Sequence, residues 1–151
     1  MDDGFGVVAP DDVPTETFNT CDVSVRKLTE RLGCTELRVN QVVLAPGDVT
    51  TPHRHEEQEE VFVAMTDGQI AVDGDIRDVP AGGVVRVGPG RVRNLLNGTD
   101  VTHVWLAFGA PRSEWSMISA HTRSRRRPSD RGADGRPWNG GLPGLARSNT
   151  S

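Results

Sequence analysis

Short apolar segments separated by glycine-containing turns recur through the middle of this chain, and they restrict its fold more than any other feature. The segments cover residues 37–44, 60–65, 69–72, 75–78, 84–87, 92–96 and 102–108. Turn residues stand between them, and Asp73-Gly74 has the composition of a two-residue hairpin. Many short strands with a turn about every 8–12 residues are typical of a sandwich or barrel. The sequence therefore predicts an all-β fold, a small antiparallel β-barrel or jelly roll.

Two segments are harder to interpret. In residues 24–32, Val25, Leu28 and Leu32 fit a helical stripe, whereas Val25 followed by Gly33 fits a strand and a turn equally well. Residues 115–118 alternate in polarity, and they could form one more edge strand or cover an end of the barrel.

Composition divides the chain into three parts. Residues 1–22 are rich in Asp, Pro and Thr, and we expect a loosely ordered N-terminal arm. Residues 23–121 hold almost all the apolar segments, which are enough for one small core, and we expect the barrel domain there. Residues 122–151 are rich in Arg, Gly, Pro and Ser and offer little apolar area to offset the entropy of ordering them. We expect a disordered tail.

Charge follows the same division. Residues 1–121 carry a net charge of −9 and residues 122–151 a net charge of +5. The acidic body argues against a nucleic-acid-binding face, and a solvated tail without a partner is the simplest interpretation of the basic end. The longest apolar runs fall far short of the roughly 20 residues that a membrane span needs, and the acidic start lacks the features of a signal peptide. We expect a cytoplasmic protein with reduced thiols at Cys21 and Cys34.

Potential metal ligands cluster just before one of the predicted strands. His53 and His55 stand one residue apart, so in an extended segment their imidazoles point the same way. Glu60 opens the strand of residues 60–65 and should share a face with Phe62 and Ala64. Imidazole and carboxylate are usual ligands for iron, manganese, zinc and nickel. The spacing predicts a divalent-metal site.

The stretch from Gly47 to Gly68 resembles the first motif of the cupin superfamily, G-x5-H-x-H-x(3,4)-E-x6-G. His53, His55 and Glu60 fall on its ligand positions, although seven residues instead of six separate Glu60 from Gly68. Glu59 has the shorter spacing that the motif also permits, but Glu60 directly precedes the apolar strand. The resemblance, which covers roughly residues 25–110, implies a small β-barrel with its site in the mouth. It also implies a homodimer paired through sheet edges.

Residues 82–97 resemble the second cupin motif, G-x5-P-x-G-x2-H-x3-N, with one important departure. Gly82, Gly90 and Asn97 fall into place, but Arg93 occupies the position of the family's last histidine ligand. Moving the alignment by one residue puts Asn94 there instead, so neither alignment recovers a histidine. Arginine offers only donors and cannot ligate a metal.

Three interpretations of the site follow. In the first, His53, His55 and Glu60 bind the metal and leave positions open, while Arg93 holds an anionic substrate or pairs with Glu59. In the second, no metal binds, and Arg93 forms a bidentate salt bridge with Glu60. In the third, His103 on the last predicted strand completes the ligand set.

These alternatives lead to different functions. The chain is either a metal-dependent oxygenase, isomerase or decarboxylase, or a non-catalytic cupin that holds a small polar or anionic molecule. An interaction module ranks last. Candidate catalytic groups are Arg93, as an anion-orienting residue, and Glu59, as the only distinct general base. We expect a small-molecule ligand and no nucleotide cofactor, because no phosphate-cradling loop or dinucleotide fold is evident.

Overall fold

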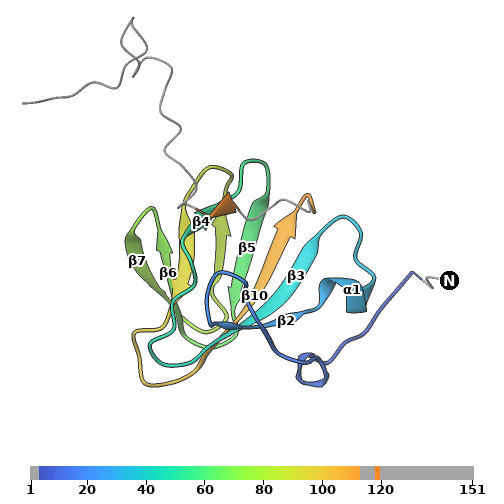
Figure 1. Ribbon diagram of the computed structural model, residues 1–151, viewed down its shortest axis with the longest axis horizontal. Helices are drawn as coiled ribbons and strands as arrows, with labels where there is room; N and C mark the ends of the chain where they lie inside the picture. Colours follow the sequence, from blue (N-terminus) through green and yellow to red (C-terminus); the bar gives the residue numbers. More distant parts are fainter. Residues whose placement is uncertain (1–3, 113–117, 120–151) are drawn as a thin grey trace, which may run out of the picture.

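The computed structural model describes residues 4–112 and 118–119, and these residues form a two-layered β-structure (Figure 1). The strands are β1 (Glu16–Thr17), β2 (Ser24–Lys27), β3 (Arg38–Leu44), β4 (His53–Arg54), β5 (Glu59–Ala64), β6 (Gly68–Val72), β7 (Asp75–Val79), β8 (Val84–Val87), β9 (Arg93–Leu96), β10 (His103–Ala110) and β11 (Ile118–Ser119). A short 3-10 helix, η1 (Pro10–Asp12), and one turn of helix, α1 (Thr29–Leu32), complete the described elements.

The strands form two antiparallel sheets that enclose the core. A six-stranded sheet has the order β1-β2-β3-β10-β5-β8, and a five-stranded sheet has the order β11-β4-β9-β6-β7. Leu44, Phe62 and Trp105 from the first sheet pack with Ile70 and Leu95 from the second. Because both sheets contribute side chains to one apolar cluster, they face each other as in a jelly roll. The predicted all-β antiparallel fold is confirmed.

The alternation expected in the strand after the histidines is present. Glu60, Phe62 and Ala64 are buried in β5, while their neighbours Val61 and Val63 are half-buried. Phe62 meets the ring of Trp105 edge to face, with ring centroids 6.4 Å apart. Glu60 thus lies on the face of the sheet that carries the core, at the end where apolar packing stops.

The hairpin signal at Asp73-Gly74 is also confirmed. Asp73 and Gly74 have φ values of 50° and 86°, and they join β6 to β7 in the left-handed conformation of a type I′ turn. Asp73 further fixes the turn, because its carboxylate accepts a hydrogen bond from the Val92 amide at 3.0 Å. The turn therefore sets the register of the second sheet near β9.

The ambiguous segment 24–32 contains both predicted structures in succession. Ser24–Lys27 forms β2, which pairs with β3, and the chain then turns into α1. Gly33 ends this helix in the left-handed conformation, with φ of 73°. Neither element spans the whole segment, because β2 ends at Lys27, opposite Asn40, and α1 begins at Thr29.

The N-terminal arm packs against the barrel. β1 pairs with β2, and Val13 is buried with Leu28 and Val39 in a second apolar cluster. These contacts extend the packed part of the chain to the N-terminal side of residue 23, where we placed the start of the domain. Cys21 and Cys34 are free thiols. The predicted tail of residues 122–151, together with residues 115–117, lies outside the described residues.

Gly68, the last residue of the first motif, is required by close packing. A Cβ atom placed there would lie 2.4 Å from Cζ2 of Trp105, which is fully buried. Any side chain would displace this indole from the core. Within residues 4–112 and 118–119, no helix has both the length and the apolar character needed to cross a membrane.

Candidate metal centre

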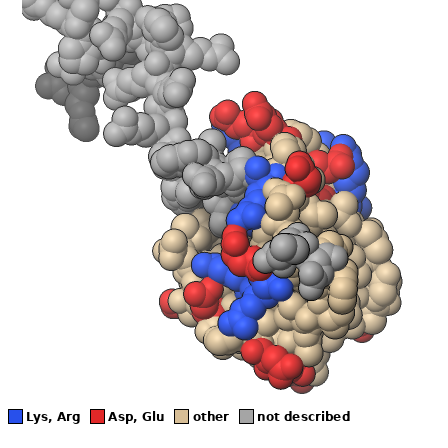
Figure 2. Space-filling model, turned by 90° about the vertical axis from the view of Figure 1, so that its right-hand side faces the viewer, with Lys and Arg blue, Asp and Glu red and all other residues tan. Residues whose placement is uncertain are grey.

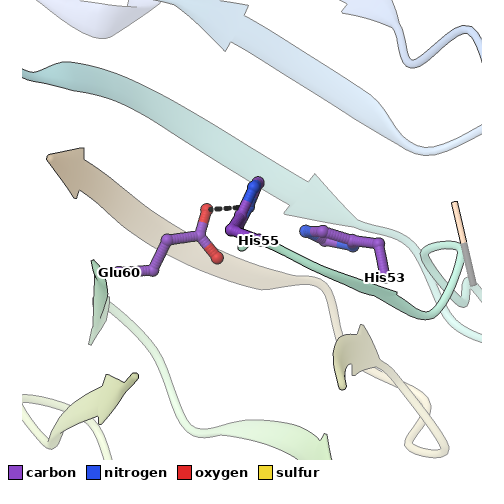
Figure 3. Close-up of side chains that lie close together, drawn as sticks. All are labelled: His53, His55 and Glu60. Carbon is purple, nitrogen blue, oxygen red and sulfur yellow. Dashed lines mark ion pairs between the residues drawn. The ribbon is translucent and has the colours of Figure 1, made fainter. Parts of the chain in front are cut away.

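His53, His55 and Glu60 converge inside the barrel. Their ligand atoms all lie within 4.8 Å of one another, and Figure 3 shows the three side chains pointing toward one another. β4 carries His53, the following loop carries His55, and β5 carries Glu60. His55 and Glu60 are only 1% and 6% exposed. The predicted ligand set is therefore brought together in a largely buried place.

The imidazole of His53 has the tautomer that a metal ligand needs. Its Nδ1 lies 3.0 Å from the carbonyl oxygen of Thr51, which can only accept a hydrogen bond. Nδ1 therefore carries the proton, and Nε2 keeps a free lone pair. Burial lowers the pKa of His53, although the Thr51 carbonyl and Glu60 oppose the shift, so the ring is neutral at neutral pH.

His55 is almost fully buried, and neither of its ring nitrogens meets a partner in hydrogen-bond geometry among the described residues. Its Nε2 lies 3.2 Å from Oε1 of Glu60, and its ring meets that of His53 edge to face, with centroids 5.0 Å apart. Leaving a buried polar atom without a partner costs about 1–3 kcal/mol. A metal ion would use such a nitrogen, so this residue fits the role of a ligand.

Glu60 is held in its charged form. Burial by itself raises the pKa of this carboxyl, but the contact with His55 and the Coulombic interactions with His55, Arg93 and His53 outweigh it and lower the pKa overall. A charged carboxylate beside two imidazoles is a suitable donor set for a first-row divalent metal.

Arg93 lies beside these ligands, at the place where the second motif positions it. It is paired with His53 across β4 and β9, and its Nε lies 3.2 Å from Oε2 of Glu60. Nη1 donates to the carbonyl of Arg91 at 3.0 Å, and Nη2 to the carbonyls of Val87 and Gly88 at 3.3 and 3.4 Å. Arg93 pairs with Glu60, but through one nitrogen, so the contact is not the bidentate bridge of the second interpretation.

These contacts define what Arg93 can do. The side chain is fully buried, and all three nitrogens face protein atoms. The guanidinium is therefore placed to hold Glu60 and the loop before β9, and has no nitrogen directed at a molecule in the barrel.

Glu59 lies away from the cluster. Its exposed carboxylate pairs with Arg86, with 2.6 Å between Oε2 and Nη2. Adjacent residues of a strand point to opposite faces, so the turn of Glu60 into the barrel directs Glu59 to solvent. The structure brings Glu59 close to neither the metal ligands nor Arg93.

His103 does not complete the ligand set. It is buried, but its Nε2 lies 3.0 Å from the hydroxyl of Thr99. Glu60 is opposite Gly109 on β10, and His103 lies six residues earlier on that strand. At about 3.3 Å per residue, this places His103 about 20 Å away, at the other end of the barrel.

Two further side chains reach the cluster that sequence reasoning missed, Arg38 and Gln58. Nη2 of Arg38 donates to Oε1 of Gln58 at 2.9 Å and lies 3.5 Å from Oε1 of Glu60. Arg38 begins the alternation that places Val42 and Leu44 in the core, so the period of β3 already assigned it to the interior face. The contact itself depends on how three strands pair.

A small cavity of about 60 Å³ adjoins the cluster. His53, Glu60 and Arg93 line it on one side, and apolar side chains such as Phe62 and Val42 line the other. This space is enough for several water molecules. A metal ion held by the three ligands would therefore face room for only a few atoms of another molecule.

Comparison with known proteins identifies the fold. No protein-family model matches the chain, and no curated protein matches its sequence. Solved structures do match. A predicted oxalate decarboxylase from Thermotoga maritima superposes with a TM-score of 0.62 at 19% identity, covering 70% of this chain and 99% of that one. A sugar phosphate isomerase from a cupin superfamily of Silicibacter pomeroyi gives 0.60 at 21%, covering 71% and 76%. The chain has the cupin fold.

A third neighbour supports the same conclusion. A cupin 2 conserved barrel domain protein from Salinispora arenicola has a TM-score of 0.56 at 23% identity, covering 69% of this chain and 85% of the other. At these identities the likeness establishes the fold alone. In this cupin barrel, the donor chemistry of His53, His55 and Glu60 fits a divalent metal. Arg93, a cation, stands where the second motif has a histidine.

Proposed function

We propose that this cupin-fold protein binds a divalent metal ion through His53, His55 and Glu60 and acts on, or holds, a small polar or anionic molecule beside it. The observation that carries the proposal is His55. Its imidazole is buried and faces the other two ligands, and the Glu60 carboxylate, 3.2 Å from Nε2, does not meet it in hydrogen-bond geometry; Nδ1 has no partner among the described residues. A metal ion would satisfy an atom that the fold otherwise leaves unsatisfied.

The chain's residues prepare the site in three ways. His53 presents a neutral nitrogen because the Thr51 carbonyl holds the proton on the other one. Glu60 supplies one negative charge, and Arg93 fixes its carboxylate from the side. Phe62 and Val42 limit the water that can enter. A bound iron, manganese, zinc or nickel ion would supply Lewis-acid chemistry toward an oxygen of the bound molecule.

Whether the bound molecule is transformed is a separate proposal. The similar structures carry the names of a decarboxylase and an isomerase, which supports a metal-dependent enzyme of the oxygenase, isomerase or decarboxylase kind. The described cavity holds no separate general base, because Glu59 is directed to solvent. A proton acceptor would have to come from a metal-bound water or from the substrate.

A second candidate function is a metal-free binding protein. The observation in its favour is the pair between Arg93 and Glu60, in which a resident cation already neutralises the only acidic ligand. In this case His53 and His55 would serve as hydrogen-bonding groups for the ligand. A cytoplasmic location and a homodimer are further proposals, and size-exclusion chromatography with light scattering would test the second.

Elemental analysis of the full chain, purified without chelator, tests the metal proposal. We expect a substantial fraction of an equivalent of one first-row metal, and an increase in thermal stability when that metal is added, because a ligand at 100 times its Kd stabilises the native state by about 2.7 kcal/mol. Less than about a tenth of an equivalent, with no increase on adding iron, manganese, zinc or nickel, would overturn the proposal.

The variant Arg93→His tests whether Arg93 stands in the place of a metal ligand. If Arg93 occupies the place of a missing ligand, the added imidazole should raise metal affinity, because it adds a donor and removes a cation. Arg86→His is the matched control, since Arg86 lies on the exposed face beside Glu59. Equal metal affinity in wild type and Arg93→His would place Arg93 outside the metal's reach and show that the alignment of the second motif is wrong.

A further inference from the structure

A second and larger cavity adjoins the small one and opens toward solvent. It measures about 430 Å³, which falls within the roughly 300–1,000 Å³ of typical ligand pockets. Phe18, Thr20, Arg38 and Asn40 line both cavities. We call the larger one the vestibule. The 60 Å³ cavity alone is too small for a metabolite, so a ligand that reaches the metal ligands must extend into the vestibule.

Strand register makes the two cavities parts of one surface. Arg38, Asn40 and Val42 alternate along the interior face of β3. Val25 and Lys27 of β2 lie directly opposite Val42 and Asn40, so they point to the same side. The vestibule therefore continues the interior of the barrel toward its edge strands, and Arg38 stands at the boundary.

Charge at this boundary is unbalanced. Arg93 and Arg38 both face the single carboxylate of Glu60. The guanidinium groups stay charged at any physiological pH, so the cluster keeps one positive charge in excess without a metal and more with one. A ligand bound against this cluster would be stabilised by a negative charge of its own.

Only Arg38 has nitrogens left to bind such a charge. Its contacts with Gln58 and Glu60 both use Nη2, while Nε and Nη1 have no partner among the described residues, and its side chain is 23% exposed. The other basic groups of the vestibule, Lys27 and Arg112, are already in ion pairs with Glu16 and Glu30. Figure 2 shows the side that carries α1, where basic and acidic side chains are intermixed.

The position of Arg38 is fixed by its neighbours. The amide nitrogen of Gln58 donates to the carbonyl of Pro111 at 3.0 Å, which turns its oxygen toward Arg38. Gly109 lies between Arg38 and Glu60 in the sheet, opposite both of them. A Cβ atom on Gly109 would lie 2.6 Å from the Gln58 side chain, so the absence of one creates the space in which these groups meet.

We propose that Arg38 binds the acidic group of an elongated, hydroxylated anion whose body lies in the vestibule. The proposal deepens the proposed function, on which it rests, by naming a ligand class and a specificity-determining residue. The atoms next to the acidic group would reach the small cavity beside His53 and Glu60. Thr17, Asn19, Thr20 and Asn40 are uncharged polar residues of the vestibule lining that can meet hydroxyl groups, and the charged lining residues Lys27, Glu30 and Arg112 are in ion pairs. The planar fork of arginine matches a carboxylate or a phosphate.

Calorimetry on the full chain, with and without added Mn²⁺, tests this proposal with four probes. Gluconate and sorbitol 6-phosphate are elongated anions, and they distinguish a carboxylate from a phosphate. Sorbitol has the length without the charge, and glycolate has the charge without the length. We expect one of the two elongated anions to bind at least about 10-fold more tightly than both sorbitol and glycolate, as a charge-assisted hydrogen-bond pair would provide.

Variants assign the effect to the residue. Arg38→Gln should weaken the preferred anion about 10-fold or more and leave sorbitol unchanged, while Arg38→Lys should keep part of the affinity because it retains charge but not the fork. Arg86→Gln, on the exposed outer face, is the control and should bind like wild type. Asn40→Ala should weaken the elongated anion but not glycolate.

Three results would overturn the proposal: no binding of either elongated anion, equal binding of glycolate, or wild-type affinity in Arg38→Gln. Metal content, measured on the same samples, keeps the two proposals apart. Arg38-dependent anion binding in a protein that takes up no metal would contradict the metal function alone. A metal-loaded protein without Arg38-dependent binding would contradict this inference alone.

Discussion

Two polar clusters lie inside one barrel, and they differ in how completely their hydrogen bonds are formed. The mouth cluster consists of His53, His55, Glu60, Arg93 and Arg38, and the floor network consists of Asn97, Thr99 and His103. In the floor network, the Asn97 amide donates to the carbonyls of Leu44 and Val101 and its oxygen accepts from the amide and hydroxyl of Thr99. In the mouth cluster, Nδ1 of His55 has no partner among the described residues, and Nε2 lies 3.2 Å from the Glu60 carboxylate but outside hydrogen-bond geometry.

The difference distinguishes a network that stabilises the fold from a cluster that is suited to bind a ligand. A buried polar network with its donors and acceptors paired fixes a loop, as Asn97 does between β9 and β10, and needs nothing else. A buried cluster with unpaired atoms lowers the stability of the fold. Such atoms therefore indicate a place where a ligand can bind. Nδ1 of His103 is the one atom of the floor network that lacks a partner among the described residues.

The largest expected effect comes from Glu60→Gln. Removing this charge leaves the fully buried guanidinium of Arg93 without its counterion, and breaking one partner of a buried pair costs about 3–5 kcal/mol. Urea unfolding of the metal-free protein measures this loss in the free energy of unfolding. Glu59→Gln is the matched control, because the neighbouring exposed pair with Arg86 should contribute at most about 1 kcal/mol. Equal stability of the two variants would show that the mouth cluster holds no buried ion pair.

Metal affinity should distinguish the two ends of the barrel. His53→Ala removes one of three ligands, and we expect the affinity to fall about 100-fold or more, since changes even beyond the direct ligands cost about 10–100-fold. His103→Ala removes a histidine of similar burial in the floor network and should leave affinity unchanged. Competition with a chromogenic chelator measures both. A comparable loss in His103→Ala would reject the assignment of the two clusters.

A substitution in the floor network should lower stability and leave metal binding unchanged. Asn97→Ala leaves the buried carbonyl of Leu44 without its donor, and we expect a loss of about 2 kcal/mol in the free energy of unfolding. Metal content and anion binding should stay as in wild type. If Asn97→Ala lowers metal binding without lowering stability, the two clusters are coupled and the comparison fails.

The smallest effect is a dependence of stability on pH that arises in the mouth cluster. The pKa of His53 lies below its ordinary 6.5 and that of Glu60 below its ordinary 4.5. Because both pKa values are lower in the folded protein, the unfolded chain binds protons at a higher pH than the folded protein does. Stability of the metal-free protein should therefore be complete above about pH 6.5 and decrease as pH falls, first through His53 and then through Glu60. His53→Gln should abolish the first decrease, and an unchanged profile would contradict the assignment.

Much of the fold could be predicted because its signals are local. The residues of β8 were predicted without error, the Asp73-Gly74 hairpin adopts the expected turn, and alternation in β5 placed Glu60 inward. Segment 24–32 was harder, because a four-residue strand followed by one helical turn leaves too few residues for either period to be recognised.

The candidate site, like the fold, could be predicted only in part. The spacing of His53, His55 and Glu60 predicted their convergence, because only four residues separate His55 from Glu60. The roles of the arginines were not predictable. Arg93 turned out to donate to backbone carbonyls of the loop between β8 and β9, and such contacts have no signature in side-chain chemistry.

The sequence by itself determined most strands and turns of the barrel and the convergence of His53, His55 and Glu60, because each depends on neighbours within a few residues. Only the tertiary structure decided that Arg38 and Arg93, far apart along the chain, meet the same carboxylate of Glu60. That meeting depends on the register of β3, β10 and β5 across Gly109 and of β4 against β9. Register between distant strands is set by the packing of the whole barrel, which no local pattern contains.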